Sequence, residues 1–413
     1  MSSSDNLSIV VNALPLKGLL TGIARYTRNL YRCLSAMDGI TVSYFDGLNL
    51  TEEMPCQADP ASWIKQTDFA WKLPHPVVFA LRVITWIRFE HALNRIIPAS
   101  GAELYHETAF TPAALRYNIP QVFTLHDLSL LHKSATHPAE RVWFFKLFFK
   151  RRLKYAKHIL VPSNFVKKEL CEMVGFPADR VSVTPEGVDP VFRSVSKAEI
   201  SKTLTRYRIK TPYLLFVGTL EPRKNLDVII HALPHLPPEI NLVLAGWKGW
   251  GSKSWQARIK QWGLSDRVFI PGYVDEKSLV AIYNGALALV YPSTYEGFGL
   301  PVLEAMACGC PVICSNVASI PEVAGNAALY MQPFSTDDLI KAVMEIYENP
   351  ERRNEMIEAG FKRASLFAWE KTAELTVKVF KKVVSLSNTR NTSNHKLQPL
   401  TSSESSSQNP KLP

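Results

Sequence analysis

The sequence lacks a long, uninterrupted apolar run. Even residues 77–97 are interrupted by charged or polar side chains, namely Arg82, Arg88, Glu90, His91 and Arg95. A helix that crosses a bilayer needs about 20 mostly apolar residues, so no membrane-spanning helix is expected. The apolar segment 7–14 is too short for a secretory signal and has no basic flank. The expected location is therefore the cytoplasm.

Cysteine is scarce, with six residues in a chain of 413. Cys308, Cys310 and Cys314 lie close together, but no histidine or second cysteine pair stands nearby at the spacing of a four-ligand zinc site. They fall at a predicted helix end and along a predicted buried strand. We therefore expect free thiols in the core, without disulfides, and neither a bound metal nor a cofactor.

Acidic side chains are fewer than basic ones, with 37 Asp and Glu against 47 Lys and Arg, which gives a net charge of +10. Such an excess implies an anionic partner. The sequence shows no helix-turn-helix, zinc-finger or RNP-type signature, so nucleic acid is not the expected partner. A diphosphate site and a membrane-facing stripe explain the excess better.

Short apolar runs alternate with helical patterns in two successive series. The first series includes a predicted helix over 21–34 and strand-like runs at 7–14, 104–106, 122–125 and 158–162. The second series has strand-like runs at 213–218, 241–246, 268–272, 286–291 and 312–313. Strands separated by helices predict parallel sheets with crossover connections. Two such series predict two doubly wound α/β domains, in keeping with the chain length.

The expected domain limits follow changes in composition. The first domain covers residues 1–195 and the second covers 205–366, because a charged segment between them interrupts the strand pattern. Residues 367–385 carry apolar side chains at helical spacing and are expected to form a closing helix. Residues 386–413 are rich in Ser, Asn, Thr, Gln and Pro without an apolar period. We expect this tail to be disordered.

The most informative segment is residues 291–311, YPSTYEGFGLPVLEAMACGCP. It follows a strand-like run, and Pro301 marks the start of a helix. Glu296 and Glu304 stand on either side of this turn, at the carboxyl end of a predicted parallel strand. Ligands bind at such ends in open α/β sheets. Taken singly, each residue also has a structural explanation, since a carboxylate in the first turn of a helix is favoured by the helix dipole.

A second informative segment is residues 216–225, FVGTLEPRKN. A predicted strand ends at Gly218, the cations Arg223 and Lys224 follow, and Asn225 is the predicted N-cap of the next helix. Cations at the amino end of a helix form an anion site together with the backbone N–H groups. The alternative is a pair of solvated loop charges, which is the commoner fate of two adjacent cations.

Together these segments resemble one family, the retaining GT-B glycosyltransferases of the glycogen-synthase and mannosyltransferase type (family 4, also called group 1). Its marks are an E-x7-E pair within the string EGFGLPxLEAMAxGxPV and the string GTxxPRKN. The resemblance implies two Rossmann-like domains with a cleft between them and a last helix that crosses back onto the first domain. The implied activity is a metal-independent, retaining transfer of a hexose from a nucleotide-diphosphate sugar. A metal-dependent glycosyltransferase would be expected to have a D-x-D pair after a strand, and no such pair stands out in this sequence.

Roles for individual residues follow from the same resemblance. Arg223 and Lys224 would hold the diphosphate and stabilise the charge that builds on the leaving group. Glu304 would accept hydrogen bonds from the ribose hydroxyls, and Glu296 would face the donor sugar and take part in catalysis. The other implied donor contacts are Gly22, Gly218, Val274 and the backbone N–H groups of Phe298, Gly299 and Leu300.

Two segments of the first domain are similar to a subgroup rich in mannosyl- and rhamnosyltransferases. Residues 15–27, PLKGLLTGIARYT, resemble its TGIGRYT loop, with Ala24 in place of the second glycine. Residues 123–129, FTLHDLS, match a strand end where the family has a histidine near the anomeric centre of the donor sugar. The resemblance carries this catalytic role to His126 and assigns Asp127 to the acceptor.

A further match lies at residues 184–189, TPEGVD. It resembles the NGVD turn near the interdomain cleft of the family. Glu186 replaces the usual asparagine, so no role is assigned to it.

The subgroup resemblance also sets expectations for substrates. The expected donor is GDP-mannose, and the expected acceptor is a glycan or lipid-linked glycan in surface polysaccharide or lipopolysaccharide synthesis. Two alternatives stay open: a UDP- or ADP-sugar donor, as in sucrose or glycogen synthesis, and a non-catalytic scaffold with the same fold. The scaffold alternative is disfavoured because the chain has Arg223, Lys224, Glu296 and Glu304.

A predicted helix over residues 141–158 would place four lysines on one face, which are Lys146, Lys150, Lys154 and Lys157. Aromatic side chains lie elsewhere on the same predicted helix. One interpretation is a solvated basic edge over a buried aromatic face. The other is a peripheral contact with an anionic membrane surface on the inner face of the cytoplasmic membrane.

Overall fold

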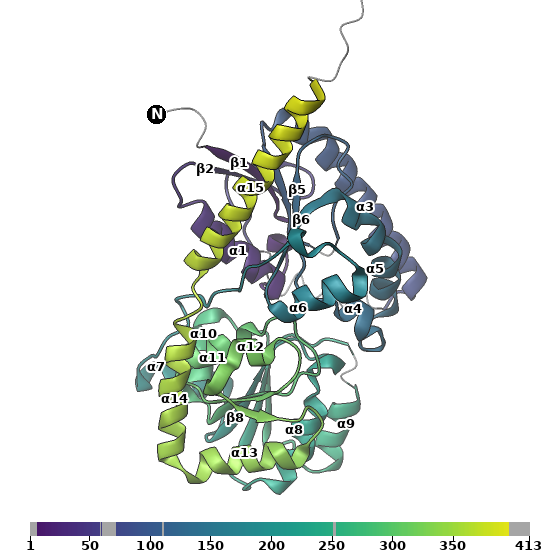
Figure 1. Cartoon of the computed structure of the whole chain (residues 1–413). Helices are drawn as coiled ribbons and strands as arrows, with labels where there is room; N and C mark the ends of the chain where they lie inside the picture. The colour runs from purple at the N-terminus through teal and green to yellow at the C-terminus, as the bar shows by residue number, and fades with distance from the viewer. Residues whose placement is uncertain (1–5, 58, 60–71, 110, 251–252, 396–413) are drawn as a thin grey trace, which may run out of the picture.

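The computed structural model describes residues 6–57, 59, 72–109, 111–250 and 253–395. They form two α/β units, one above the other in Figure 1. Within these ranges, no helix combines the length and the apolar character that crossing a bilayer requires.

The first unit is built on a seven-stranded sheet in the order β3-β2-β1-β4-β5-β6-β7, parallel except for the β2–β3 pair. The strands are β1 (Leu7–Asn12), β2 (Ile40–Phe45), β3 (Leu50–Thr51), β4 (Leu104–Glu107), β5 (Gln121–Thr124), β6 (Ala156–Val161) and β7 (Val181–Val183). Within the described residues, its α-helices are α1 (Gly22–Leu34), α3 (His75–Ile96), α4 (Ser129–His132), α5 (Ala139–Arg152) and α6 (Asn164–Glu169). Strands β1, β4, β5 and β6 are the predicted ones. The sequence pattern missed β2, β3 and β7.

The second unit has a six-stranded parallel sheet in the order β10-β9-β8-β11-β12-β13. The strands are β8 (Tyr213–Val217), β9 (Asn241–Ala245), β10 (Val268–Gly272), β11 (Ala288–Tyr291), β12 (Val312–Ser315) and β13 (Leu329–Met331). The helices are α7 (Lys197–Tyr207), α8 (Leu226–Ala232), α9 (Lys253–Gln261), α10 (Glu276–Gly285), α11 (Leu300–Ala307), α12 (Ile320–Ala324), α13 (Thr336–Glu348) and α14 (Pro350–Ala364). Five strands were predicted and β13 was missed. Helices cover both faces, which explains why these strands read as continuous apolar runs.

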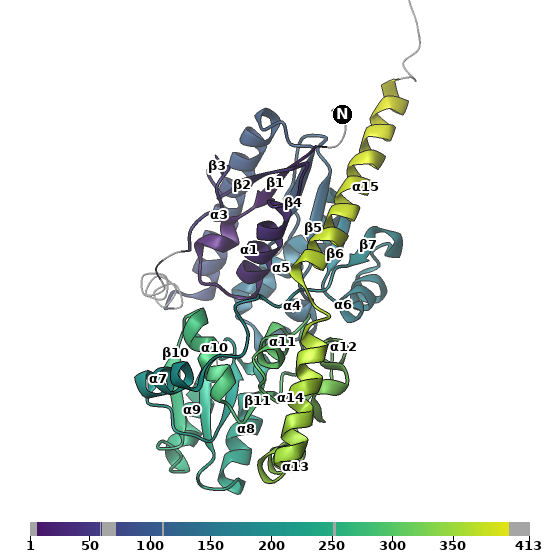
Figure 2. The same ribbon diagram turned by 90° about the vertical axis from the view of Figure 1, so that its left-hand side faces the viewer.

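The last helix, α15 (Trp369–His395), returns to the first unit, where it packs against α1 and β6. Figure 2 shows it running along that unit, while α14 lies along the second. The prediction of disorder from residue 386 is wrong for residues 386–395, which continue this helix. A helix already formed and packed extends at low cost, because only nucleation is unfavourable. The rest of the predicted tail lies outside the described residues.

The predicted helix over 141–158 is shorter than expected. Helix α5 ends at Arg152, Lys154 lies in a 3-10 turn, and Lys157 lies on β6. The four lysines therefore do not share one helix face. The local helical pattern gives way because β6 begins at Ala156 and pairs in parallel with β5 and β7. Sheet pairing and burial decide this boundary, and local propensity does not.

Polar bonds connect the two units. The Arg28 guanidinium on α1 donates to both carboxylate oxygens of Glu276 on α10, at 3.0 and 2.7 Å. The Ser163 hydroxyl before α6 donates to the carbonyl oxygen of Gly297 at 2.8 Å. The backbone N–H of Phe165 donates to Glu322 on α12 at 2.6 Å. These bonds connect helices and loops of the first unit to helices and loops of the second.

Candidate active site at the junction of the two units

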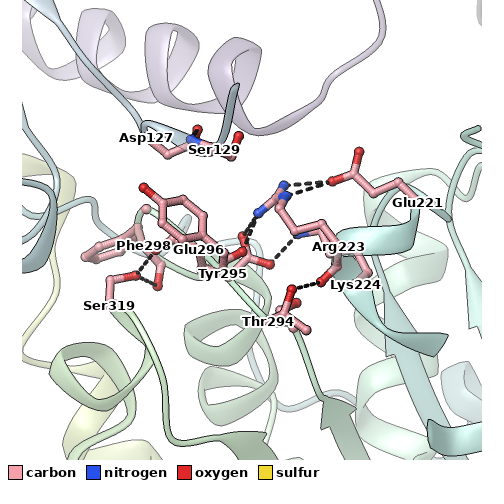
Figure 3. A network of polar contacts seen from close by, with 12 residues as sticks. Asp127, Ser129, Glu221, Arg223, Lys224, Thr294, Tyr295, Glu296, Phe298 and Ser319 are labelled. Carbon is pink, nitrogen blue, oxygen red and sulfur yellow. Dashed lines mark hydrogen bonds and ion pairs between the residues drawn. The ribbon is translucent and has the colours of Figure 1, made fainter. Parts of the chain in front are cut away.

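The two segments singled out from the sequence meet at one edge of the second sheet. Strands β8 and β11 are neighbours, and the strand order runs outward from them in opposite directions. This is the switch point at which open α/β sheets bind ligands. The turn 222–224 follows β8 and the loop 292–299 follows β11, so their side chains converge, as Figure 3 shows.

Glu296 lies at the centre of the converging side chains. Its carboxylate accepts hydrogen bonds from Arg223 Nη1 at 2.9 Å and from Lys224 Nζ at 2.6 Å (Figure 3). All three residues are buried. Burial raises the pKa of Glu296, but the charges of Arg223 and Lys224 outweigh it and lower this pKa to about 2. Glu296 is therefore ionised at neutral pH, and the structure brings this acid and the two cations into one buried cluster.

A second carboxylate, Glu221, holds the other side of Arg223. Its Oε1 accepts from Arg223 Nε at 3.1 Å and from Nη2 at 2.7 Å. Burial alone would lower the pKa of Arg223, but Glu296 and Glu221 raise it well above its usual value. The sequence interpretation gave Glu221 no role, although its place in the string TLEPRKN was visible. Two cations thus face two carboxylates.

The cations still have hydrogen-bonding capacity. Arg223 also donates to the Tyr295 carbonyl oxygen at 2.6 Å, and Lys224 donates to the Tyr291 hydroxyl at 3.1 Å. A guanidinium and an ammonium both carry more N–H groups than these bonds use. Each cation therefore keeps an N–H group that these bonds do not use.

The predicted capping role of Asn225 is wrong. Its φ is 55°, and its side chain makes no hydrogen bond to the start of α8. Instead, its amide donates to the carbonyl oxygens of Pro292, at 3.2 Å, and Pro333. Asparagine tolerates this left-handed conformation better than most residues. Asn225 thus ties the cation turn to the loop that carries Glu296.

The glycine-rich loop between Glu296 and α11 is held rigidly. The Ser319 hydroxyl lies 2.9 Å from the carbonyl oxygens of both Glu296 and Phe298. Gly299 has φ 121°, which side-chain-bearing residues rarely adopt. Helix α11 begins at Leu300, and its second residue, Pro301, has no N–H. The Val302 N–H donates to the Gly299 carbonyl oxygen at 3.0 Å, so the Leu300 N–H is the one in this turn without an acceptor in the helix. This arrangement suits an anionic or hydroxylated ligand.

Glu304, one turn into α11, contacts the first unit instead of another part of its own loop. Its Oε1 accepts from Arg25 Nη1 on α1, and its Oε2 accepts from the Tyr283 hydroxyl at 3.0 Å. Burial lowers the pKa of Arg25, but Glu304 and its neighbours raise it overall. Arg25 was quoted within the TGIARYT loop but received no role. Only the packing of α1 against the second unit identifies it.

His126 stands at the junction, after β5. Its Nδ1 lies 3.5 Å from Glu186 Oε1, and its Nε2 lies 3.3 Å from the Thr108 carbonyl oxygen. A Cβ built on Gly297 would lie 1.9 Å from the His126 carbonyl oxygen. Only glycine permits this close approach. The structure therefore brings His126 beside the loop of Glu296, as a site role requires.

The remaining predicted residues lie around this centre. Asp127 accepts from the backbone N–H of Ser129 at 2.9 Å, and Figure 3 shows this pair across from Tyr295. Gly22 is the first residue of α1, and a Cβ there would meet nothing within 4 Å. Gly218 follows β8 with φ 144°. Val274 is a buried residue of the core.

All six cysteines are free thiols, and Cys308, Cys310 and Cys314 are buried. Burial raises the pKa of Cys310 to about 12. Among the described residues, no group of three or more His, Cys, Asp and Glu side chains has the arrangement of a metal site.

Two Rossmann-like units joined at their carboxyl-end loops, with a charged cluster at the switch point, define the fold of the GT-B glycosyltransferases. Residues 20–192 match the family model described as "Glycosyltransferase Family 4", and residues 201–363 match "Glycosyl transferases group 1". The chain is 31% identical to O-antigen chain mannosyltransferase B of Escherichia coli over 387 residues, which cover 91% of this chain and 100% of that protein. It therefore belongs to this glycosyltransferase family and is an enzyme of that class.

Solved structures show the same fold at lower sequence identity. Sucrose-phosphate synthase from Thermosynechococcus elongatus superposes with a TM-score of 0.72 at 22% identity, over 92% of this chain and 100% of that chain. HepE from Anabaena, solved with UDP and glucose, superposes with a TM-score of 0.68 at 15% identity, over 91% of this chain and 100% of that chain. Both confirm the predicted fold class.

Proposed function

We propose that the enzyme transfers mannose from GDP-mannose, with retention of configuration, to a glycan or lipid-linked glycan in surface polysaccharide synthesis. The observation that carries the proposal is the buried cluster of Glu296, Arg223 and Lys224 at the β8–β11 switch point. The sugar and the acceptor class are supported by the full-length similarity to an O-antigen chain mannosyltransferase.

In this proposal Arg223 and Lys224 bind the diphosphate. When the bond between sugar and phosphate breaks, negative charge grows on the leaving diphosphate, and preplaced cations stabilise it without reorganisation. Their bonds to Glu296 keep them oriented before the donor arrives. This charge takes the place of a metal ion in a metal-independent reaction.

Glu304 binds the ribose hydroxyls, and it must share its carboxylate to do so. In the structure Arg25 and Tyr283 already donate to its two oxygens. A carboxylate oxygen can accept more than one hydrogen bond, but this one is buried. Donor binding therefore requires the Arg25 side chain, or the helix α1 that carries it, to move away from Glu304.

Glu296 and His126 face the sugar, and Asp127 faces the acceptor. Gly22, Gly218, Val274 and the N–H groups of residues 298–300 complete the donor contacts. The closed junction excludes water from the reacting centre and limits hydrolysis.

A donor screen tests the proposal. The enzyme is incubated with GDP-mannose, UDP-glucose or ADP-glucose and an acceptor glycan, and mass spectrometry detects the transferred hexose. Transfer from GDP-mannose is expected, and loss of turnover is expected in Arg223→Ala. Arg352→Ala, which removes an exposed ion pair with Glu345, is the control and should stay active. Transfer from UDP-glucose alone would replace the mannosyl assignment with the sucrose-synthase-like alternative.

We also propose that the first unit makes a peripheral contact with the anionic inner surface of the cytoplasmic membrane. Helices α3 and α5 are in contact, and both expose large apolar side chains, namely Val77, Leu81, Ile84, Ile87, Trp143 and Leu147. Lys146 and Lys150 are exposed on α5 beside them, while Lys154 and Lys157 are exposed on the segment that follows. Apolar and basic side chains on one surface are typical of peripheral binding.

Vesicle flotation tests this contact. Binding to vesicles with acidic lipid is expected, with a large loss in Lys146→Glu/Lys150→Glu and in Leu81→Glu. Lys341→Glu, on α13 of the second unit, is the charge-matched control. Equal binding of the wild type to neutral vesicles would remove the electrostatic part of the proposal.

A further inference from the structure

The turn that carries Glu186 is held in place by residues at the start of α15 and just before it. The backbone N–H of Val188 donates to the Phe367 carbonyl oxygen at 3.0 Å, and the Thr372 hydroxyl donates to the Pro185 carbonyl oxygen at 2.6 Å. A Cβ built on Gly187 would lie 2.3 Å from the backbone nitrogen of Trp369. Glu186 therefore stands on a turn that cannot swing away.

The carboxylate of Glu186 points at one functional group. Its Oε1 lies 3.5 Å from His126 Nδ1, and the two side chains are only 7% and 18% exposed. Within the part of the chain that the structure describes, no other ion pair or hydrogen bond to Glu186 is recorded. A buried carboxylate is costly unless it is matched by a donor or a positive charge. A proton on Nδ1 of His126 supplies that match.

The other ring nitrogen also faces an acceptor. His126 Nε2 lies 3.3 Å from the Thr108 carbonyl oxygen, and the Nδ1 contact with Glu186 is 3.5 Å, so both ring contacts are at the long end of hydrogen-bond distances. Because a carbonyl oxygen only accepts, the Thr108 contact requires a proton on Nε2. Tyr26 packs edge-on against the ring, with centroids 4.8 Å apart, and this leaves the ring plane defined. A sugar hydroxyl that replaces the Thr108 contact can donate to Nε2, and the single proton of a neutral ring then lies on Nδ1, facing Glu186.

We propose that Glu186 is a positioning residue for His126. It accepts from Nδ1–H, fixes which ring nitrogen carries that proton, and leaves Nε2 directed to the donor sugar. A carboxylate does this more strongly than the asparagine of the related NGVD turn, because the acceptor is ionised. The proposal rests on the proposed placement of His126 at the sugar.

The test is a double-mutant cycle in the full-length enzyme, with kcat, the KM for the donor and the melting temperature measured for each variant. Glu186→Ala is expected to lower kcat by on the order of tenfold or more, with a smaller change in KM. Glu186→Gln keeps an oxygen acceptor in the same place and should lose less activity. In the His126→Ala background, Glu186→Ala should have no further effect on kcat, because a positioning residue acts only through its partner.

Asp189→Asn provides the matched control, since Asp189 ends the same turn but pairs with Arg28. Its effect on kcat should add to that of His126→Ala.

Additive losses for Glu186→Ala and His126→Ala would overturn the positioning role, as would an unchanged kcat in Glu186→Ala. An unchanged kcat in His126→Ala would instead refute the proposed function of His126, and the two failures are thus distinguished. A melting temperature that falls in Glu186→Ala but not in Glu186→Gln, with kcat equal in both, would show a purely structural role.

Discussion

Replacing Glu296 with glutamine removes the charge that balances Arg223 and Lys224. The pKa of Glu296 lies at about 2 in the folded protein, compared with 4.5 for a free glutamate. A difference of about 2.5 units corresponds to about 3 kcal/mol of stability from the ionised carboxylate. Removal of one partner from a buried ion pair costs about the same, roughly 3–5 kcal/mol. We therefore expect Glu296→Gln to lower the free energy of unfolding by about 3 kcal/mol at pH 7.

The pH dependence follows from the sign of the shift. A depressed pKa means that the stabilisation is fully present above the unfolded pKa of 4.5 and is lost as the pH falls through the folded pKa of about 2. The difference in unfolding free energy between wild type and Glu296→Gln should thus be constant from about pH 5 to about pH 8 and shrink below that range.

Urea unfolding followed by circular dichroism measures this difference. Glu345→Gln is the control, because its ion pair with Arg352 is exposed on the surface and should contribute less than about 1 kcal/mol. GDP should restore more stability to Glu296→Gln than to the wild type, because its phosphates supply the missing negative charge. A loss below about 1 kcal/mol, or a difference that varies between pH 5 and 8, would refute the reasoning.

Other variants test the junction. Arg25→Ala removes the side chain that competes with the ribose for Glu304, so the affinity for GDP should rise several-fold. The affinity for 2′,3′-dideoxy-GDP, measured by the same calorimetry, should not change. Equal effects on both nucleotides would contradict ribose binding by Glu304. Gly297→Ala places a Cβ 1.9 Å from the His126 carbonyl oxygen and should lower kcat by tenfold or more with little loss of secondary structure. Gly187→Ala forces a similar clash against α15 and should lower the melting temperature by several degrees, about 2–4 °C for each kcal/mol lost.

Local sequence patterns predicted the strands that lie in the middle of each sheet. Residues of β8, β9 and β11 are buried on both faces and read as apolar runs. One missed strand, β2, has six residues, of which three are buried, so it does not read as an apolar run. The other three missed strands lie at sheet edges: β3 has two residues, and β7 and β13 have three each. Such short segments carry too few residues for a periodic signal.

Helix ends were predicted less well than helix existence. The lysine pattern of residues 146–157 fits a helix, yet the chain leaves it after Arg152 to form β6. In contrast, α15 runs past the end of its apolar pattern. In both cases the boundary depends on what the segment packs against, and that information does not lie in the segment itself.

The sequence alone determined the class of the enzyme and led to the residues proposed for its donor half. Arg223, Lys224 and Glu296 occur in strings whose strand–loop–helix context is local, so their convergence at adjacent strand ends followed from a parallel sheet. The tertiary structure decided what reaches this centre from elsewhere. Arg25 meets Glu304, and Glu186 meets His126, because separate segments pack together across the junction. Contacts between distant segments depend on how whole elements pack, and no local spacing encodes them.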